Sequence, residues 1–137
     1  MLAINYGAVV GSAVAAFIVG WLWYGPLFGK AWMGMMGYTK EGMKTMKGQV
    51  SMGTGMMLAF LGSLVMSYIL ARFIAVWHVA DATGALKLAF QIWLGFIATV
   101  TLGTVLWENR TPKLYFFNAI YQLVNLYVIA LVLVLWQ

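Results

Sequence analysis

The sequence contains no cysteine and few charged residues. The absence of cysteine excludes a disulfide framework and a thiolate metal site. It also means that the redox compartment cannot be inferred from thiol usage. Charged residues make up 8% of the 137 residues and hydrophobic residues 64%, whereas soluble globular domains have about 25% and about 45–50%, respectively. So few charged side chains do not supply the polar surface that a domain of this size needs in water. We therefore expect lipid to surround most of the chain.

The net charge of +5 does not indicate a nucleic-acid partner. The basic residues are few, and they sit in short gaps between apolar runs instead of forming one basic surface. This distribution is typical of charges that set the orientation of a membrane protein. The lipid bilayer is thus the expected partner, and no nucleic acid is expected.

Groups for catalysis or metal binding are also scarce. His78 and Asp81 provide too few ligands for a metal ion, and the ten methionines do not indicate a copper site without cysteine or a histidine cluster. The sequence contains no recognisable Ser-His-Asp set, glycine-rich phosphate loop or carboxylate pair. We therefore predict no catalytic residue, no metal and no cofactor, and the sequence does not identify a small-molecule ligand.

Four apolar windows are long enough to cross a bilayer. A hydrocarbon core of about 30 Å requires about 20 apolar residues in a helix, and the windows cover residues 3–24, 52–76, 85–107 and 114–136. Backbone groups in lipid must bond within the chain, which excludes open strands. Before the last window, Thr111 is suited to cap a helix and Pro112 to occupy its first position. The sequence predicts an all-α bundle of four transmembrane helices in a single domain, residues 1–137.

Basic and aromatic residues predict the same orientation in the membrane. The gaps at 25–51 and 108–113 carry most of the lysines and arginines, so the positive-inside rule places both gaps in the cytoplasm. Tyr6, Trp77 and Trp136 mark the outer boundary, and Trp107 and Tyr115 mark the inner one. We expect a multi-pass membrane protein with both termini outside.

The first gap, residues 26–50, has two helical patterns of its own. Apolar residues between Phe28 and Met35 recur on one helical face, which favours a short segment along the inner interface. Further on, three lysines share one side of a helix that would rest on anionic headgroups, and a solvated loop is the alternative. The predicted interface anchors are Trp23, Tyr24, Phe28, Trp32, Lys40, Lys44 and Lys47.

Three of the predicted helices carry small residues at every fourth position. Small residues let helix backbones approach each other in lipid, where burial of apolar surface drives association only weakly. These ladders indicate either self-association or packing within one bundle. The predicted small-residue seam comprises Gly7, Gly11, Gly55, Ala59, Ser63, Ser67, Gly95, Thr99 and Gly103.

The fourth predicted helix carries a polar stripe. Its amides and tyrosines fall within about 120° of arc when they are projected at 100° per residue. Polar groups near the midplane face the protein interior, because lipid offers no hydrogen-bond partner. The stripe indicates either a polar cavity or interhelical hydrogen bonds, each worth about 0.6–2 kcal/mol. With its expected partners on the third helix, the candidate cavity comprises Gln91, Thr101, Asn118, Tyr121, Gln122 and Asn125.

Several motifs resemble those of the domain of unknown function 1761 family of small bacterial membrane proteins. The most specific is the run Trp23-Tyr24-Gly25-Pro26-Leu27-Phe28-Gly29-Lys30-Ala31-Trp32. The later half resembles the family in Trp93-Leu94-Gly95-Phe96, Trp107-Glu108 and Lys113-Leu114, leading into Asn118 and Tyr121. The resemblance spans nearly the whole chain. It implies a four-helix protein of the bacterial inner membrane and leaves its activity unassigned.

Three functions remain open from the sequence. The first is a non-enzymatic protein that associates with itself, as a homo-oligomer, or with membrane partners through the small-residue seam. The second is a small transporter or channel for a neutral or small solute, lined by the polar stripe; the lack of a membrane-embedded carboxylate disfavours proton-coupled export. The third is a membrane enzyme acting on a lipophilic substrate, for which no catalytic motif is visible.

Overall fold

The computed structural model describes residues 4–36, 52–109 and 111–136. Its regular elements in these ranges are all helical, which confirms the predicted all-α bundle. In chain order they are α1 (Tyr6–Leu22), η1 (Trp23–Leu27), α2 (Gly29–Met36), α4 (Met52–Val76), α5 (Ala82–Ile92), η2 (Trp93–Ala98), α6 (Thr99–Thr101), α7 (Gly103–Leu106) and α8 (Pro112–Leu135). The two elements labelled η are π-helical turns.

Side-chain caps determine where three of the long helices begin. Asn5 accepts a hydrogen bond from the Ala8 amide at 3.1 Å, and Asp81 accepts one from the Gly84 amide at 2.8 Å. Thr111 caps α8 through the Leu114 amide at 3.2 Å, with Pro112 in the first turn, as the sequence predicts. We call each of the four predicted transmembrane helices a crossing; the third comprises α5, η2, α6 and α7. The Asp81 cap starts this third crossing at Ala82, three residues before the apolar window of the sequence begins.

The third crossing is irregular, whereas its sequence predicts one continuous helix. A π-helical turn at η2 and a break at Leu102 interrupt the regular backbone pattern. Threonine hydroxyls bond nearby carbonyls: Thr99 donates to Gly95 at 2.7 Å, and Thr101 donates to Ile97 at 2.6 Å. These bonds satisfy the threonine hydroxyls, which would otherwise face hydrocarbon without a partner.

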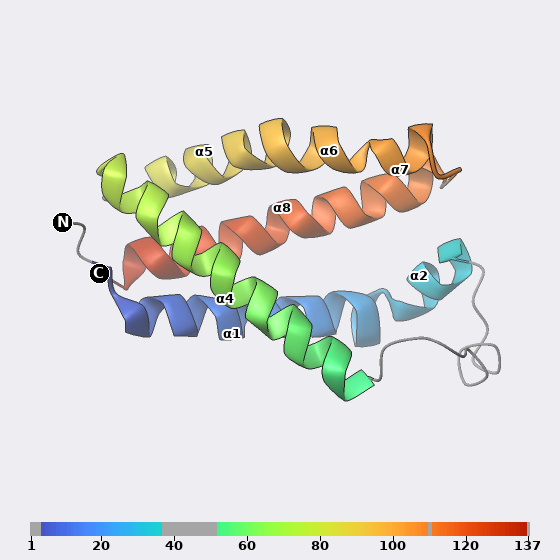
Figure 1. Ribbon diagram of the computed structural model, residues 1–137, viewed down its shortest axis with the longest axis horizontal. Coiled ribbons are helices and arrows are strands. Elements are labelled where there is room, and N and C mark those ends of the chain that lie inside the picture. Colours follow the sequence, from blue (N-terminus) through green and yellow to red (C-terminus); the bar gives the residue numbers. More distant parts are fainter. Residues whose placement is uncertain (1–3, 37–51, 110, 137) are drawn as a thin grey trace.

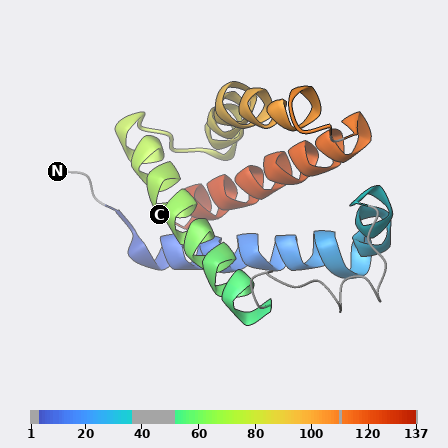
Figure 2. The ribbon, with the colours of Figure 1, turned by 45° about the vertical axis from the view of Figure 1, so that its right-hand side comes forward.

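The other three crossings pack around α8. Figure 1 shows α5 to α7 along one side of α8 and α1 along the other, while α4 crosses α1 obliquely. The turned view in Figure 2 confirms that α4 lies across α1. The amide of Asn5 donates to the Trp136 carbonyl at 2.7 Å, so both described ends of the chain lie together. We call this end of the bundle the terminal end. The opposite end, which contains the loop before α8, is the hairpin end.

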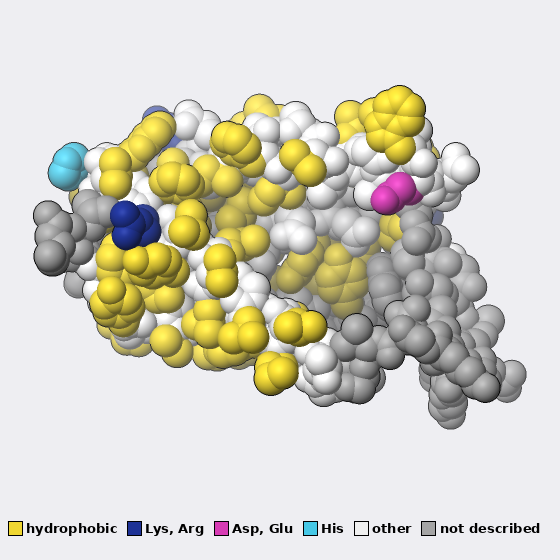
Figure 3. Space-filling model, in the orientation of Figure 1, with side chains coloured by type: hydrophobic (Ala, Val, Ile, Leu, Met, Phe, Trp, Pro, Cys, Tyr) yellow, Lys and Arg dark blue, Asp and Glu magenta, His cyan; other side chains and the backbone are white. Residues whose placement is uncertain are grey.

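Alanine and other small side chains make up much of the buried interior. Ala13, Ala85, Ala89 and Ala130 have no exposed surface, and Ile129 is equally buried among them. Large apolar side chains instead cover the outside, and Figure 3 shows hydrophobic atoms over most of the described flank. Four helices within the described residues are long and apolar enough to cross a membrane: Tyr6–Leu27, Gly53–Val76, Ala82–Leu106 and Pro112–Leu135.

Candidate functional site: two cavities along α8

A sharp turn after the first crossing directs aromatic side chains toward α8. In η1 the Phe28 amide donates to the Trp23 carbonyl at 3.2 Å, and Pro26 contributes no amide hydrogen to the helix. The chain then passes so close to itself that a Cβ atom at Gly29 would lie 2.9 Å from the Tyr24 carbonyl oxygen. Only glycine fits this approach without a backbone shift. The turn therefore fixes the direction of Trp23 and Tyr24.

The aromatic residues of this turn pack against the start of α8. The Trp23 ring lies 5.5 Å from the Phe117 ring and 5.8 Å from the Tyr121 ring, centroid to centroid. Phe28 adds a contact with Trp23 at 4.7 Å. Aromatic pairs at these separations contribute about 0.5–1.5 kcal/mol each beyond the area they bury. This cluster joins the end of the first crossing to α8 at the hairpin end.

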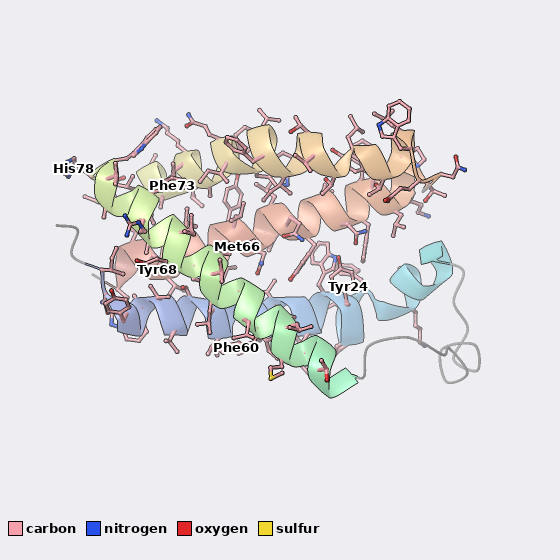
Figure 4. All side chains as sticks on the ribbon, in the orientation of Figure 1. Tyr24, Phe60, Met66, Tyr68, Phe73 and His78 are labelled. Carbon is pink, nitrogen blue, oxygen red and sulfur yellow. The ribbon has the colours of Figure 1, made fainter. Side chains whose placement is uncertain are left out.

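Tyr24 makes a direct polar contact with the stripe on α8. Its hydroxyl donates to the Asn118 Oδ1 atom at 2.6 Å. Figure 4 shows the Tyr24 side chain in the space between α1 and α8. A tyrosine hydroxyl that leaves water normally finds such a partner, because an unpaired one is costly in a low dielectric. The bond ties η1 to the polar face of α8.

The larger of two cavities beside this bond has a volume of about 830 Å³. Its walls come from the second half of α1, the first half of α4 and the middle of α8. Figure 3 shows a hollow on this flank with hydrophobic side chains in its depth. The lining residues are Ala16, Phe17, Gly20, Trp21, Tyr24, Gly55, Met56, Ala59, Gly62, Ser63, Met66, Tyr121, Gln122 and Asn125.

The smaller cavity has a volume of about 500 Å³ and lies on the other side of Tyr24. It is lined by Tyr24, Thr101, Thr104, Tyr115, Asn118, Ala119 and Gln122. Tyr24 and Gln122 belong to the walls of both cavities. The Tyr24–Asn118 hydrogen bond therefore lies at the partition between them.

One amide of the larger cavity lacks a hydrogen-bond partner. Asn125 lines that cavity with 5% of its surface exposed, and its Oδ1 atom accepts no hydrogen bond in the described part of the chain. A buried amide oxygen without a donor costs about 1–3 kcal/mol. Native proteins retain such groups mainly where a ligand, an ion or a water satisfies them. Asn125 therefore needs a hydrogen-bond donor that the described residues do not supply.

Five of the six residues predicted for the polar cavity line one or both cavities. Tyr121 and Asn125 line the larger one, Thr101 and Asn118 line the smaller one, and Gln122 lines both. Gln91 is exposed on the third crossing and lines neither cavity. Sequence reasoning missed Tyr24 as a cavity residue, because its place at the end of an apolar helix indicated an interface anchor.

The predicted small-residue seam divides among three environments. Ser67 is fully buried, whereas Gly55, Ala59 and Ser63 line the larger cavity. On α1, the Trp136 ring lies over Gly11, with Gly7 nearby. On the third crossing Gly95 and Thr99 are exposed, and Gly103 is partly buried with only the Trp107 ring near it.

The predicted interface anchors also differ in their placement. Trp23 and Tyr24 pack against α8, and the Trp23 indole N–H is buried without an acceptor among the described residues. Phe28 is partly exposed beside them. Trp32 belongs to α2, but its side chain falls outside the described part, and Lys40, Lys44 and Lys47 lie outside the described residues altogether.

The chain is therefore a multi-pass α-helical membrane protein with cavities along the polar face of its last crossing. It belongs to the family described as "Protein of unknown function (DUF1761)", whose model matches residues 7–134. This membership confirms the family that the sequence motifs indicate. No curated protein and no solved structure matches the chain.

Proposed function

We propose that this protein is a non-enzymatic binding and passage protein for a small uncharged molecule, acting in the bacterial inner membrane. The observation that carries the proposal is the shared wall formed by Tyr24 and Gln122. A molecule that displaces the Tyr24–Asn118 bond would move from the larger cavity into the smaller one along the polar face of α8. The lining residues supply amide and hydroxyl groups for such a molecule.

The distribution of charged residues in the protein favours an uncharged ligand that moves passively. Neither Asp nor Glu lies in the four described crossings, so a carboxylate that would couple transport to protons is lacking there. The lysines between the first two crossings support a cytoplasmic hairpin end with both termini outside. The smaller cavity, near that end, would then receive or release the molecule on the cytoplasmic side.

The test uses the natural absence of cysteine. A single cysteine in place of Gln122 is treated with a water-soluble, membrane-impermeant thiol reagent in proteoliposomes. We expect labelling well above that of a cysteine at Ala130, which has no exposed surface. Equal, background-level labelling of both positions would exclude the proposed passage function, because the water-soluble reagent would then not enter the cavity.

A second candidate function is self-association through the third crossing. Gly95 and Thr99 lie on an exposed side of that crossing, and apart from its chain neighbours and the backbone of its own helix no described atom lies within 4 Å of the Cβ position of Gly95. Small residues on a lipid-facing side allow a second helix to approach closely. A cysteine in place of Thr99 is expected to give a crosslinked dimer in native membranes. Recovery of monomer alone, there and at position 95, would exclude this function.

A further inference from the structure

We infer that Arg72, Tyr68 and Tyr6 bind the headgroup phosphate of an anionic phospholipid at the terminal end of the bundle. We call these three residues the headgroup site. The site lies apart from the two cavities, because none of its residues lines either of them. The inference therefore goes beyond the proposed function and does not depend on it.

Arg72 belongs to an exposed apolar side of α4. Val65, Ile69 and Val76 are exposed on this helix, and Arg72 falls among them at the helical spacing i, i+4, i+7 and i+11. The helix is long and apolar enough to cross the membrane. Charged side chains in such helices usually face the interior of the bundle or water. An arginine on the outer, apolar side therefore requires a partner at the membrane boundary.

The depth of Arg72 matches that of lipid headgroups. Arg72 lies four residues before α4 ends at Val76, which corresponds to about 6 Å of helix. The exposed Trp77 follows that end, and the exposed Tyr6 begins α1 at the same end of the bundle (Figure 1). Tryptophan and tyrosine gather at the boundary between acyl chains and headgroups. The guanidinium is thus within reach of the lipid phosphates.

Within the described residues the charge of Arg72 has no anionic partner. Its Nη1 atom donates to the Tyr68 hydroxyl at 3.2 Å, and its guanidinium carbon lies 5.8 Å from the centre of the Tyr68 ring. Asp81 instead caps α5 through the Gly84 amide, and Glu108 lies at the hairpin end. A guanidinium binds phosphate well, because two parallel N–H donors match two phosphate oxygens. A lipid phosphate supplies the anion that the described residues lack.

Tyr68 adds a second donor in a fixed position. Because its hydroxyl oxygen accepts the bond from Arg72, its hydrogen can point to a phosphate oxygen. The Tyr68 ring stacks on the Tyr6 ring, with 6.4 Å between the centroids and 12° between the planes. Figure 4 shows Tyr68 on the side of α4 that faces the start of α1. The stack joins two crossings and holds the hydroxyl beside the guanidinium.

The net charge of the lipid follows from the same surroundings. The ammonium group of a zwitterionic headgroup would lie close to the guanidinium and would be repelled by it. An anionic headgroup such as that of phosphatidylglycerol carries no cation, and it neutralises Arg72. Inorganic phosphate would also pair with Arg72, but only a lipid also covers the exposed Val65 and Ile69. The ligand is therefore an anionic phospholipid.

The test compares phosphatidylglycerol and phosphatidylcholine that carry the same photoactivatable diazirine in an acyl chain, each in nanodiscs that contain the full chain. Crosslinks are mapped by mass spectrometry. We expect phosphatidylglycerol to label residues 65–76 of α4 about fivefold more strongly than phosphatidylcholine. Excess inorganic phosphate should leave this ratio unchanged, because it lacks the acyl chains. Equal labelling by the two lipids, or loss of the ratio in inorganic phosphate, would overturn the inference.

Three variants assign the preference to the headgroup site. Arg72→Gln removes the guanidinium from an exposed position and should abolish the preference for phosphatidylglycerol. Tyr68→Phe keeps the ring that stacks on Tyr6 and removes only the hydroxyl, so it should lower the preference about threefold. Lys87→Gln is the matched control, because it removes one positive charge from an exposed position on α5 and should leave the preference unchanged. A preference that survives Arg72→Gln, or that Lys87→Gln lowers equally, would refute the headgroup site.

Discussion

Replacement of Gly62 by tryptophan is expected to close the larger cavity without unfolding the bundle. Gly62 lines the cavity, and apart from its chain neighbours and the backbone of its own helix no described atom lies within 4 Å of the position that its Cβ atom would occupy. The indole would therefore enter empty space, and it would not force neighbouring side chains apart. Within a helix, replacement of glycine also removes a propensity penalty of up to about 1 kcal/mol.

The measured effect is loss of access. In the Gln122→Cys background, Gly62→Trp should lower the rate of labelling by the water-soluble reagent by roughly tenfold or more, because the ring occupies the space that the reagent needs. Gly95→Trp is the matched control, since Gly95 is equally open but lies outside both cavities. Labelling at the unaltered rate in Gly62→Trp would show that molecules reach position 122 by another route.

The largest expected effect on stability comes from Ala89→Leu. Ala89 has no exposed surface and belongs to the core cluster where α5 packs against α8. A leucine there must push the two helices apart or leave its preferred rotamer, which costs about 1–3 kcal/mol. Reversible unfolding in mixed detergent micelles measures this cost. Thr99→Leu, on an exposed position of the same crossing, should change the free energy of unfolding by less than about 0.5 kcal/mol.

Similar losses of stability in the two variants would contradict the packing described for the third crossing. They would place Thr99 against protein, as in a dimer, or Ala89 against lipid. The comparison therefore also separates packing within one bundle from packing between copies.

The bundle itself follows from the sequence because the bilayer imposes strong constraints. A helix must be long enough to cross the hydrocarbon and must satisfy its own backbone, so an apolar window of sufficient length indicates its presence. The window at 52–76 has the same bounds as α4, and the cap at Thr111 was recognisable from its side chain and the following proline. These features depend on local sequence alone.

The face of each helix that packs against its neighbours could not be derived in the same way. On α1 the buried residues are Ala8, Val9, Ser12, Ala13 and Ala16, whereas the predicted ladder ran through Gly7 and Gly11. A helix rich in glycine and alanine contains several parallel ladders of small residues, and the ladder that meets a neighbour depends on the crossing angle. That angle is a property of the assembled bundle.

The contact of Tyr24 with Asn118 between the two cavities could not be predicted from the sequence, for a related reason. The amides of α8 could be assigned to one face from their spacing, and Asn118, Gln122 and Asn125 do line cavities. The role of Tyr24 depends on the turn at η1, where a π-helical hydrogen bond and the close approach at Gly29 direct its side chain toward Asn118. Such turns leave no periodic pattern in the sequence.

The most direct test of the central claim is a comparison of three nitroxide labels on α8 in lipid bilayers. Ile120 is exposed on the flank, Gln122 lines both cavities and Ile129 has no exposed surface. Collision rates with oxygen, which dissolves in hydrocarbon, and with a water-soluble nickel chelate are measured by electron paramagnetic resonance. We predict access of oxygen alone at position 120, access of the chelate at 122 and little access of either at 129. Access of oxygen alone at 122, as at 120, would contradict a cavity along the polar face of α8.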